Sequence, residues 1–285
     1  MSTLKSALVD WLVYGNVIIG LAAVGVVFTI SVFLGMMAPF ELLLVVFLIT
    51  MSSYNINRFM EQAEEDTVNH PRRSAFFSNN QSFFAFNVLL ILAVMVLAFF
   101  YKGFNGLFIV AIFPLSVLAY SAKWIPHKYS RVKEIPVMKN LFPTTIWALA
   151  PILCVVWLSA PVGPSLLASF VFVFLRLLIG VIAFDVRDVR GDRAYRINTL
   201  PVLLGIEDTK IFLLLLNTLS GLFLFVSVSE GWLPPAANAV NLITLYGYYF
   251  IFSLSEKAPL YLYDIIIDGE YFLWAPLAFI GTIVF

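Results

Sequence analysis

The chain carries little charge for its length. Asp, Glu, Lys and Arg make up 12% of its 285 residues, whereas soluble domains carry about a quarter. Acidic and basic residues balance at 17 each. The net charge therefore gives no indication that the protein binds nucleic acid or an acidic partner. Hydrophobic residues make up 61% of the chain. This composition excludes an ordinary soluble domain and indicates an integral membrane protein.

Cysteine and histidine are scarce as well. The single cysteine, Cys154, lies in an apolar segment, which excludes a disulfide or a thiolate metal framework. The two histidines, His70 and His127, lie in basic loops, where a solvated side chain is expected rather than a catalytic base. The first apolar segment is long and lacks a small-residue cleavage site, so it indicates a true membrane span. No Ser-His-Asp or Cys-His arrangement is evident.

Apolar runs of roughly 20 residues, the length that crosses a bilayer, recur along the whole chain. No stretch between them is long enough for a soluble domain. The sequence therefore predicts an all-α membrane protein, a nine-transmembrane-helix bundle that forms a single domain over residues 1–285. The predicted spans are residues 10–34, 40–58, 82–101, 104–121, 139–159, 164–186, 208–228, 236–254 and 267–285.

The basic residues indicate the orientation of these spans. The N-terminus and the loops after the second, fourth, sixth and eighth spans hold 15 of the 17 Lys and Arg residues. The opposite side holds only Lys102, and Arg176 lies within a span. Because cytoplasmic loops are enriched in Lys and Arg, we expect the N-terminus and these loops in the cytoplasm of a multi-pass cell-membrane protein.

The sixth apolar run ends in FDVRDVRGDR, residues 184–193. Its aspartates Asp185, Asp188 and Asp192 are spaced i, i+3 and i+7, which places three carboxylates on one face of a helix. A hard cation such as Mg²⁺ prefers such oxygens and takes phosphate oxygens as further ligands. The alternative is a helix end that emerges into water with its aspartates paired to arginines. Those arginines are Arg187, Arg190, Arg193 and Arg196.

A second acidic cluster follows the second apolar run, in YNINRFMEQAEEDTVNHPRRS, residues 54–74. Asn57, Glu61 and Glu64 share a helical face, and Glu65 lies slightly round from it. Two acidic faces on one membrane side, each followed by arginines, favour a cage for a diphosphate bridged by metal ions. A merely solvated helix end needs no such duplication.

With these motifs the chain resembles the UbiA superfamily of intramembrane prenyltransferases. FDVRDVRGDR with INTLPVLLG is similar to the family's D-x-x-D-x-x-G-D-R run and the T-L-P-V-x-x-G that follows it. YSAKW and RVKEIPVMKN, within residues 120–140, are similar to the family's pattern between helices four and five. NHPRR, residues 69–73, resembles the Asn-x-Pro-x-Arg after the first acidic motif. The likeness covers essentially the whole chain.

The first motif departs from the family's NDxxDxxxD. Anchored on Asn57 it reads N-R-x-x-E-x-x-x-E, with Arg58 at the first aspartate position and Glu61 and Glu65 at the others. Anchored on Asn69 instead, the register puts Gln62 and Asp66 at the aspartate positions. The exact ligand set therefore stays open, and Glu64 is an alternative to Glu65.

The resemblance implies Mg²⁺-dependent transfer of a prenyl group from a prenyl diphosphate to an aromatic or lipid-like acceptor. It implies catalytic roles for Asp185, Asp188, Asp192, Asn57 and Glu61, and metal ligation by Asn57, Glu61, Glu64, Glu65, Asp185, Asp188 and Asp192. Substrate-binding candidates are Arg72, Arg73, Tyr120, Lys123, Lys133, Lys139 and Asn16. Membrane lipid is the expected surrounding partner, with no nucleic acid. The acceptor stays open among aromatic acids, quinone precursors, glyceryl ether phosphates and porphyrin-type molecules.

Arg176 and three acidic residues before the last span are expected to have structural roles, and Asn16 has two alternatives. Arg176 is expected to hydrogen-bond a neighbouring helix or to lie at the interface, and Asn16 either reaches the headgroup region or bonds between helices. Asp264, Asp268 and Glu270 are expected to form a solvated helix start.

Three rival classes remain. A transporter would place ionisable groups near the membrane midplane. A CDP-alcohol phosphotransferase would carry a D-G-x-x-A-R run, which is absent. A non-catalytic isoprenoid-binding relative is compatible with the altered first motif.

Overall fold

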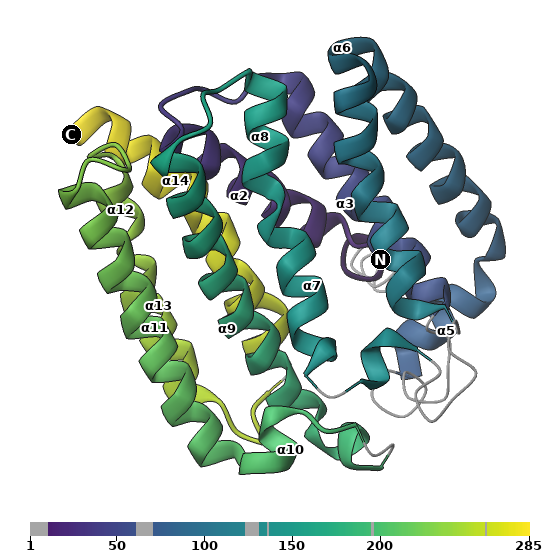
Figure 1. The fold of residues 1–285 in the computed structure, drawn as a ribbon. Helices are drawn as coiled ribbons and strands as arrows, with labels where there is room; N and C mark the ends of the chain where they lie inside the picture. The colour runs from purple at the N-terminus through teal and green to yellow at the C-terminus, as the bar shows by residue number, and fades with distance from the viewer. Residues whose placement is uncertain (1–10, 61–70, 123–130, 136, 195–196, 260) are drawn as a thin grey trace, which may run out of the picture.

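The computed structural model describes residues 11–285 except 61–70, 123–130, 136, 195–196 and 260. The side chains of residues 71–73, 133 and 264 are also outside the description. All regular secondary structure in the described part of the chain is helical. Figure 1 shows these helices gathered side by side in a single bundle. The all-α fold expected from the sequence is therefore confirmed.

Helices long and apolar enough to cross a membrane occur throughout the bundle. The six that qualify by length and composition among the described residues are α3 (Phe40–Met60), α6 (Gln81–Ser121), the run Met138–Leu158, α9 (Pro164–Ala194), α11 (Ile206–Ser229) and the run Ile265–Val284. A seventh apolar helix, α2 (Val17–Phe33), is shorter. A multi-pass membrane protein is thus confirmed, whereas the count of nine spans stays a prediction.

Local breaks explain why the helix count differs from the number of apolar runs. The expected spans 82–101 and 104–121 are joined in α6, which leaves helical geometry at Gly103 with φ 59° and ψ −149°. Glycine accepts this positive φ without the clash of a Cβ atom. Figure 1 shows two limbs of α6 beside each other, joined at the top. The fifth expected span is divided into α7 (Met138–Ala148) and α8 (Ala150–Leu158).

The C-terminal third is also subdivided. The eighth expected span consists of α12 (Ala237–Val240) and α13 (Ile243–Ser253). The last one begins in a π-helical turn, η2 (Leu262–Ile267), which leads into α14 (Asp268–Val284).

Short helices mark one end of the bundle. These are α5 (Pro71–Asn79), the 3₁₀ turn η1 (Val132–Glu134) and α10 (Leu200–Leu204). Figure 1 shows α5 and α10 at the lower end, where α9 also finishes, and the turn within α6 at the upper end. The residues after both acidic motifs therefore lie at the same end.

Helix α2 lies at the centre of the bundle, between α3 and α14. Ile30, Leu42, Ile49 and Trp274, from these three helices, are fully buried and belong to one apolar cluster. Large apolar side chains such as Phe100 face outward, where a soluble protein would expose polar ones. This pattern is that of a bundle surrounded by lipid.

Candidate active site

A cavity of about 720 Å³ opens within the bundle and is lined by α2, α3, α6, α7, α8, α9 and the first turn of α14. Its lining changes in character along its length. Polar and charged side chains of α3, α7 and the C-terminal part of α9 line one region, while Val26, Val46, Ile49 and Leu153 line another. The cavity therefore offers both a polar mouth and an apolar interior.

All three aspartates of α9 line the polar mouth, as their spacing predicted. The helix continues straight through them to Ala194, so the i, i+3 and i+7 positions stay on one face. Asp185 and Asp192 are buried, with 2% and 4% of their surface exposed. Buried carboxylates need partners, because an isolated charge away from water is strongly unfavourable.

Helix α7 supplies those partners. The Lys139 ammonium nitrogen lies 3.0 Å from Asp185 Oδ1 and 2.6 Å from Asp192 Oδ2. The Asn140 side-chain amide donates to Asp185 Oδ2 over 2.6 Å. The two aspartates therefore converge on a single cationic centre, which is the arrangement that a bound metal ion would also require.

Asp188 has a different environment. Its carboxylate accepts hydrogen bonds from Arg187 Nε at 2.9 Å and from the terminal guanidinium nitrogen at 3.1 Å. The guanidinium also lies over the rings of Phe184, at 4.9 Å, and Tyr263, at 5.8 Å. The Tyr263 hydroxyl donates to the Ser255 carbonyl at 3.1 Å.

The first acidic motif is described only in part. Asn57 lines the same cavity as the aspartates of α9, and its side-chain oxygen accepts a hydrogen bond from Ser121 over 2.6 Å. Asn57 and the second motif thus share a cavity. The other members of the first motif lie outside the described residues, so the register of this motif stays a prediction. They are Glu61, Gln62, Glu64, Glu65, Asp66 and Asn69.

Among the described residues, no three His, Cys, Asp or Glu side chains are grouped closely enough to hold a metal ion. Asp185 and Asp192 meet at Lys139, whereas Asp188 pairs with Arg187. A complete ligand set thus requires a rearrangement of Asp188 or ligands from the first motif.

Two of the predicted substrate-binding residues line the mouth. Lys139 does so through the ion pairs just described. Tyr120 stacks on Phe142 with 5.6 Å between ring centroids, and its hydroxyl donates to the Lys139 carbonyl at 3.4 Å. The side chains of Arg72, Arg73, Lys123 and Lys133 lie outside the description.

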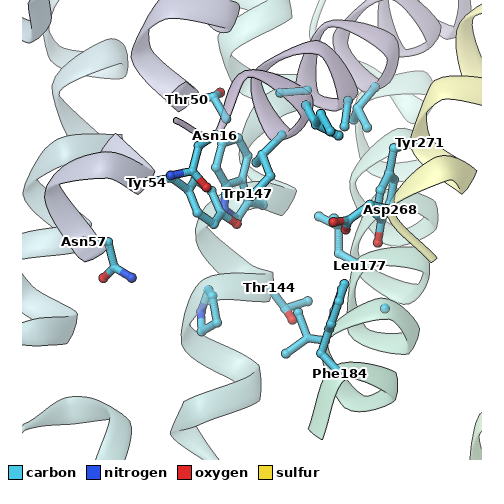
Figure 2. A pocket seen from close by; sticks show the side chains of 18 of the residues that line it. Asn16, Thr50, Tyr54, Asn57, Thr144, Trp147, Leu177, Phe184, Asp268 and Tyr271 are labelled. Carbon is cyan, nitrogen blue, oxygen red and sulfur yellow. The ribbon is translucent and has the colours of Figure 1, made fainter. Parts of the chain in front are cut away.

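Asn16 bonds between helices, which is one of the two roles considered for it, and its contact with a headgroup stays a prediction. It lines the cavity (Figure 2), and its side-chain amide donates to Asn55 Oδ1 at 2.8 Å. Asn55 in turn donates to Asn87 Oδ1 at 2.9 Å, which links α2, α3 and α6 through buried amides. Asn16 has a φ of 57° at the start of α2, a conformation that asparagine tolerates better than most residues.

The expectation of a solvated start to the last span is wrong for Glu270, whereas Asp268 is half-buried. Asp268 lines the cavity, and Figure 2 shows it beside Tyr271. Glu270 is buried, with 2% exposure, because the guanidinium of Arg176 pairs with it. The side chain of Asp264 is not described.

Arg176 behaves as expected, since its partners lie on neighbouring helices. Its Nε donates to Glu270 Oε1 at 2.9 Å, and its terminal nitrogens contact Glu270 Oε2, Asn217 Oδ1 and Ser220 Oγ. The sequence held a signal for this pair, because a lone intramembrane arginine requires a counter-charge at similar depth. The acidic residues Asp264, Asp268 and Glu270, next to the last span, were candidates for that counter-charge.

Comparisons with known proteins agree with this architecture. A structure described as digeranylgeranylglyceryl phosphate synthase in membranes superimposes with a TM-score of 0.61 at 17% identity, over 100% of this chain and 98% of the other. A UbiA homolog from Archaeoglobus fulgidus bound to DMAPP and Mg²⁺ superimposes with a TM-score of 0.63 at 16% identity, over 97% of this chain and 100% of the other. These likenesses show a shared fold.

No curated protein sequence matches the chain. The sequence model of the UbiA prenyltransferase family does match, over residues 17–263. That match spans both acidic motifs and most of the residues that line the cavity, and it ends before α14. The chain therefore belongs to the UbiA prenyltransferase family.

Proposed function

We propose that this protein is a Mg²⁺-dependent intramembrane prenyltransferase, which moves a prenyl group from an isoprenoid diphosphate to an aromatic or lipid-like acceptor. One observation carries the proposal: a single cavity combines an acidic mouth, built by Asp185, Asp188 and Asp192, with an apolar interior. A prenyl diphosphate has the same division into a charged head and a hydrocarbon tail. Family membership supports the same reaction class.

The oxygen donors of the mouth suit Mg²⁺, which prefers carboxylates and shares the phosphate oxygens of its substrate. Asp185 and Asp192 fit best, since both already reach one cationic centre within 3.0 Å. Asp188, Asn57 and the glutamates of the first motif are the candidates for the remaining ligands. When bound, Mg²⁺ would neutralise the diphosphate and stabilise it as a leaving group. The Archaeoglobus fulgidus homolog, bound to DMAPP and Mg²⁺, supports this assignment.

Other residues that line the cavity can stabilise the departing diphosphate and the allylic cation. Lys139 brings a cation to the mouth, where negative charge grows on the departing diphosphate. The rings of Tyr54 and Trp147 line the same cavity, where their faces can stabilise an allylic cation. Phe184 also lines it, with the Arg187 guanidinium over its ring at 4.9 Å. The asymmetry of Lys and Arg supports a site that opens to the cytoplasm.

The proposal is tested with purified protein and tritiated geranyl, farnesyl and geranylgeranyl diphosphates, each with a lipid or quinone-precursor extract and with or without Mg²⁺. Mg²⁺-dependent transfer of label to an extract component is the expected result. Mg²⁺-dependent binding without turnover would identify a non-catalytic isoprenoid-binding relative. Absence of binding, with uptake of a solute by proteoliposomes, would favour a transporter.

A further inference from the structure

The first turn of α14 carries a polar pair that the mechanism above does not use. Asp268 and Tyr271 are spaced i and i+3, so they share one face of the helix, and both line the cavity. Figure 2 shows them together on one side of the pocket, with Tyr54, Trp147 and Asn16 on the other side in that view. The pair lies beside the space in which the prenyl group would react.

The position of Tyr271 relative to the acidic mouth follows from Gly180. A Cβ atom at Gly180 would meet the Tyr271 hydroxyl, so that hydroxyl lies directly against the backbone of α9. Gly180 precedes Asp185 by five residues on the same helix, a rise of about 7.5 Å. The Tyr271 hydroxyl is thus set roughly one and a half turns along α9 from the first aspartate of the mouth.

The buried ion pair behind α14 fixes this arrangement. Glu270 lies between Asp268 and Tyr271 in sequence, and its side chain is held by Arg176 and by the indole of Trp274, at 3.3 Å. Because Glu270 is fixed, the helix cannot rotate without breaking that pair. Asp268 and Tyr271 are therefore preorganised toward the cavity.

Two threonines of the same lining lack partners. The hydroxyls of Thr50 and Thr144 are buried, with residue exposures of 1% and 0%, and make no hydrogen bond in the described structure. Buried hydroxyls nearly always have a partner, and a helical threonine commonly bonds its own i−4 carbonyl. Because these hydroxyl oxygens have almost no accessible surface, they would contact a polar molecule in the cavity only after a side-chain rotation.

Charge is distributed unevenly along this lining. The cations that line it among the described residues are Arg58 of α3, Lys139 of α7 and Arg187 of α9. Lys139 and Arg187 pair with the three aspartates of α9. The α14 wall contributes a carboxylate, which repels an anionic ligand and attracts a hydrogen-bond donor.

Resting on the proposed prenyl transfer, we infer that Asp268 and Tyr271 form the acceptor subsite, and that the acceptor is a neutral, hydroxyl-bearing molecule whose proton Asp268 accepts. In that step the bond between prenyl C1 and the diphosphate oxygen breaks, and the diphosphate leaves with the electron pair. A bond forms between C1 and the acceptor, and the acceptor's proton passes to the Asp268 carboxylate. The atoms and charges balance without a further reactant.

The test uses a matched pair of probes, tritiated 1-naphthol and 1-hydroxy-2-naphthoate, which differ only in a carboxylate. Their retention by the purified full-length protein is measured with Mg²⁺ and geranyl S-thiolodiphosphate, an analogue that ionises poorly. We expect the protein to bind the neutral phenol at least tenfold more tightly. Asp268→Asn should bring the ratio close to one and leave binding of the geranyl analogue unchanged. Asp208→Asn, on the exposed first turn of α11, is the matched control and should keep the preference.

The outcomes separate the two proposals. If the unaltered protein does not bind the geranyl analogue, the proposed function itself fails. If it binds the analogue but holds the naphthoate as tightly as the phenol, the acceptor inference is overturned, whatever the variants do. Persistence of the preference in Asp268→Asn would also overturn it.

Discussion

Lys139 lies between two buried carboxylates of the acidic mouth, with its ammonium nitrogen 2.6 Å from Asp192 Oδ2 and 3.0 Å from Asp185 Oδ1. Helix α7 thereby holds the charged end of α9 in place. The ammonium also stands where these two oxygens converge, so Lys139 and a divalent ion would satisfy the same carboxylates. The stability of this part of the protein should therefore depend on which cation binds these carboxylates.

Replacing Lys139 by Met leaves Asp185 and Asp192 facing each other without their cation. Breaking a buried pair costs about 3–5 kcal/mol, so we expect the Tm in detergent to fall clearly when Mg²⁺ is absent. Millimolar Mg²⁺ should restore most of the loss, because it binds the same oxygens.

Arg190→Met is the matched control. The Arg190–Glu256 pair has side-chain exposures of 72% and 41%, and exposed pairs contribute at most about 1 kcal/mol. Its Tm should barely change with or without Mg²⁺. If Lys139→Met is as stable as the unaltered protein without Mg²⁺, the carboxylates do not depend on that ammonium.

Asp188→Asn should remove activity while leaving the fold nearly intact. Its side chain is 19% exposed and pairs with the adjacent Arg187, so little packing is lost. Removal of one preorganised electrostatic group typically lowers kcat by about 10²–10³-fold. Initial rates of prenyl transfer, measured beside Tm, test this expectation. Full activity, or activity that survives removal of divalent ions by chelation, would rule out the metal assignment.

The register of the first motif is decided by alanine substitutions at Glu61, Glu64, Glu65 and Asp66. Helical spacing from Asn57 predicts large losses of Mg²⁺-dependent prenyl diphosphate consumption at Glu61 and at either Glu64 or Glu65. A large loss confined to Asp66 would favour the register set by Asn69. If none of the four variants loses activity, this cluster is a solvated helix end and the mouth has one acidic motif.

The sequence could predict features that depend on the periodicity of a single helix, but not contacts between helices that are distant in sequence. The face formed by Asp185, Asp188 and Asp192 depends only on the 3.6-residue repeat of one helix, and it was predicted correctly. The burial of Glu270 depends on Arg176, 94 residues away, and no local pattern encodes that distance. The position of Asp268 at the cavity was not predicted for the same reason, because it depends on where α14 meets α2 and α9. The sequence placed a boundary between the spans 82–101 and 104–121, where Gly103 leaves helical geometry. The break at Leu149 between α7 and α8 lies inside one apolar run, and uniform hydropathy hid it.

The expected topology can be measured by labelling single cysteines in a Cys154→Ala background. Ser78 is exposed in α5, at the end of the bundle assigned to the cytoplasm, whereas Val162 lies in the turn before α9 with 80% exposure. A membrane-impermeant maleimide applied to intact cells should label Val162→Cys and spare Ser78→Cys. After permeabilisation both should react. Labelling of Ser78→Cys from outside would contradict the assigned orientation.

The Arg176–Glu270 pair should show strong coupling in unfolding experiments, because both side chains are almost fully buried, at 0% and 3% exposure. Arg176→Met alone leaves the Glu270 carboxylate without its cation, and Glu270→Gln alone leaves the guanidinium short of a counter-charge. Each single change is therefore expected to cost about 3–5 kcal/mol. The double variant removes both charges, so its loss of stability should be smaller than the sum of the single losses by about 1–3 kcal/mol. Strictly additive losses would mean that Asn217 and Ser220, rather than Glu270, satisfy Arg176. Since the pair also orients α14, both single variants should lose the preference for a neutral phenol while still binding the geranyl analogue.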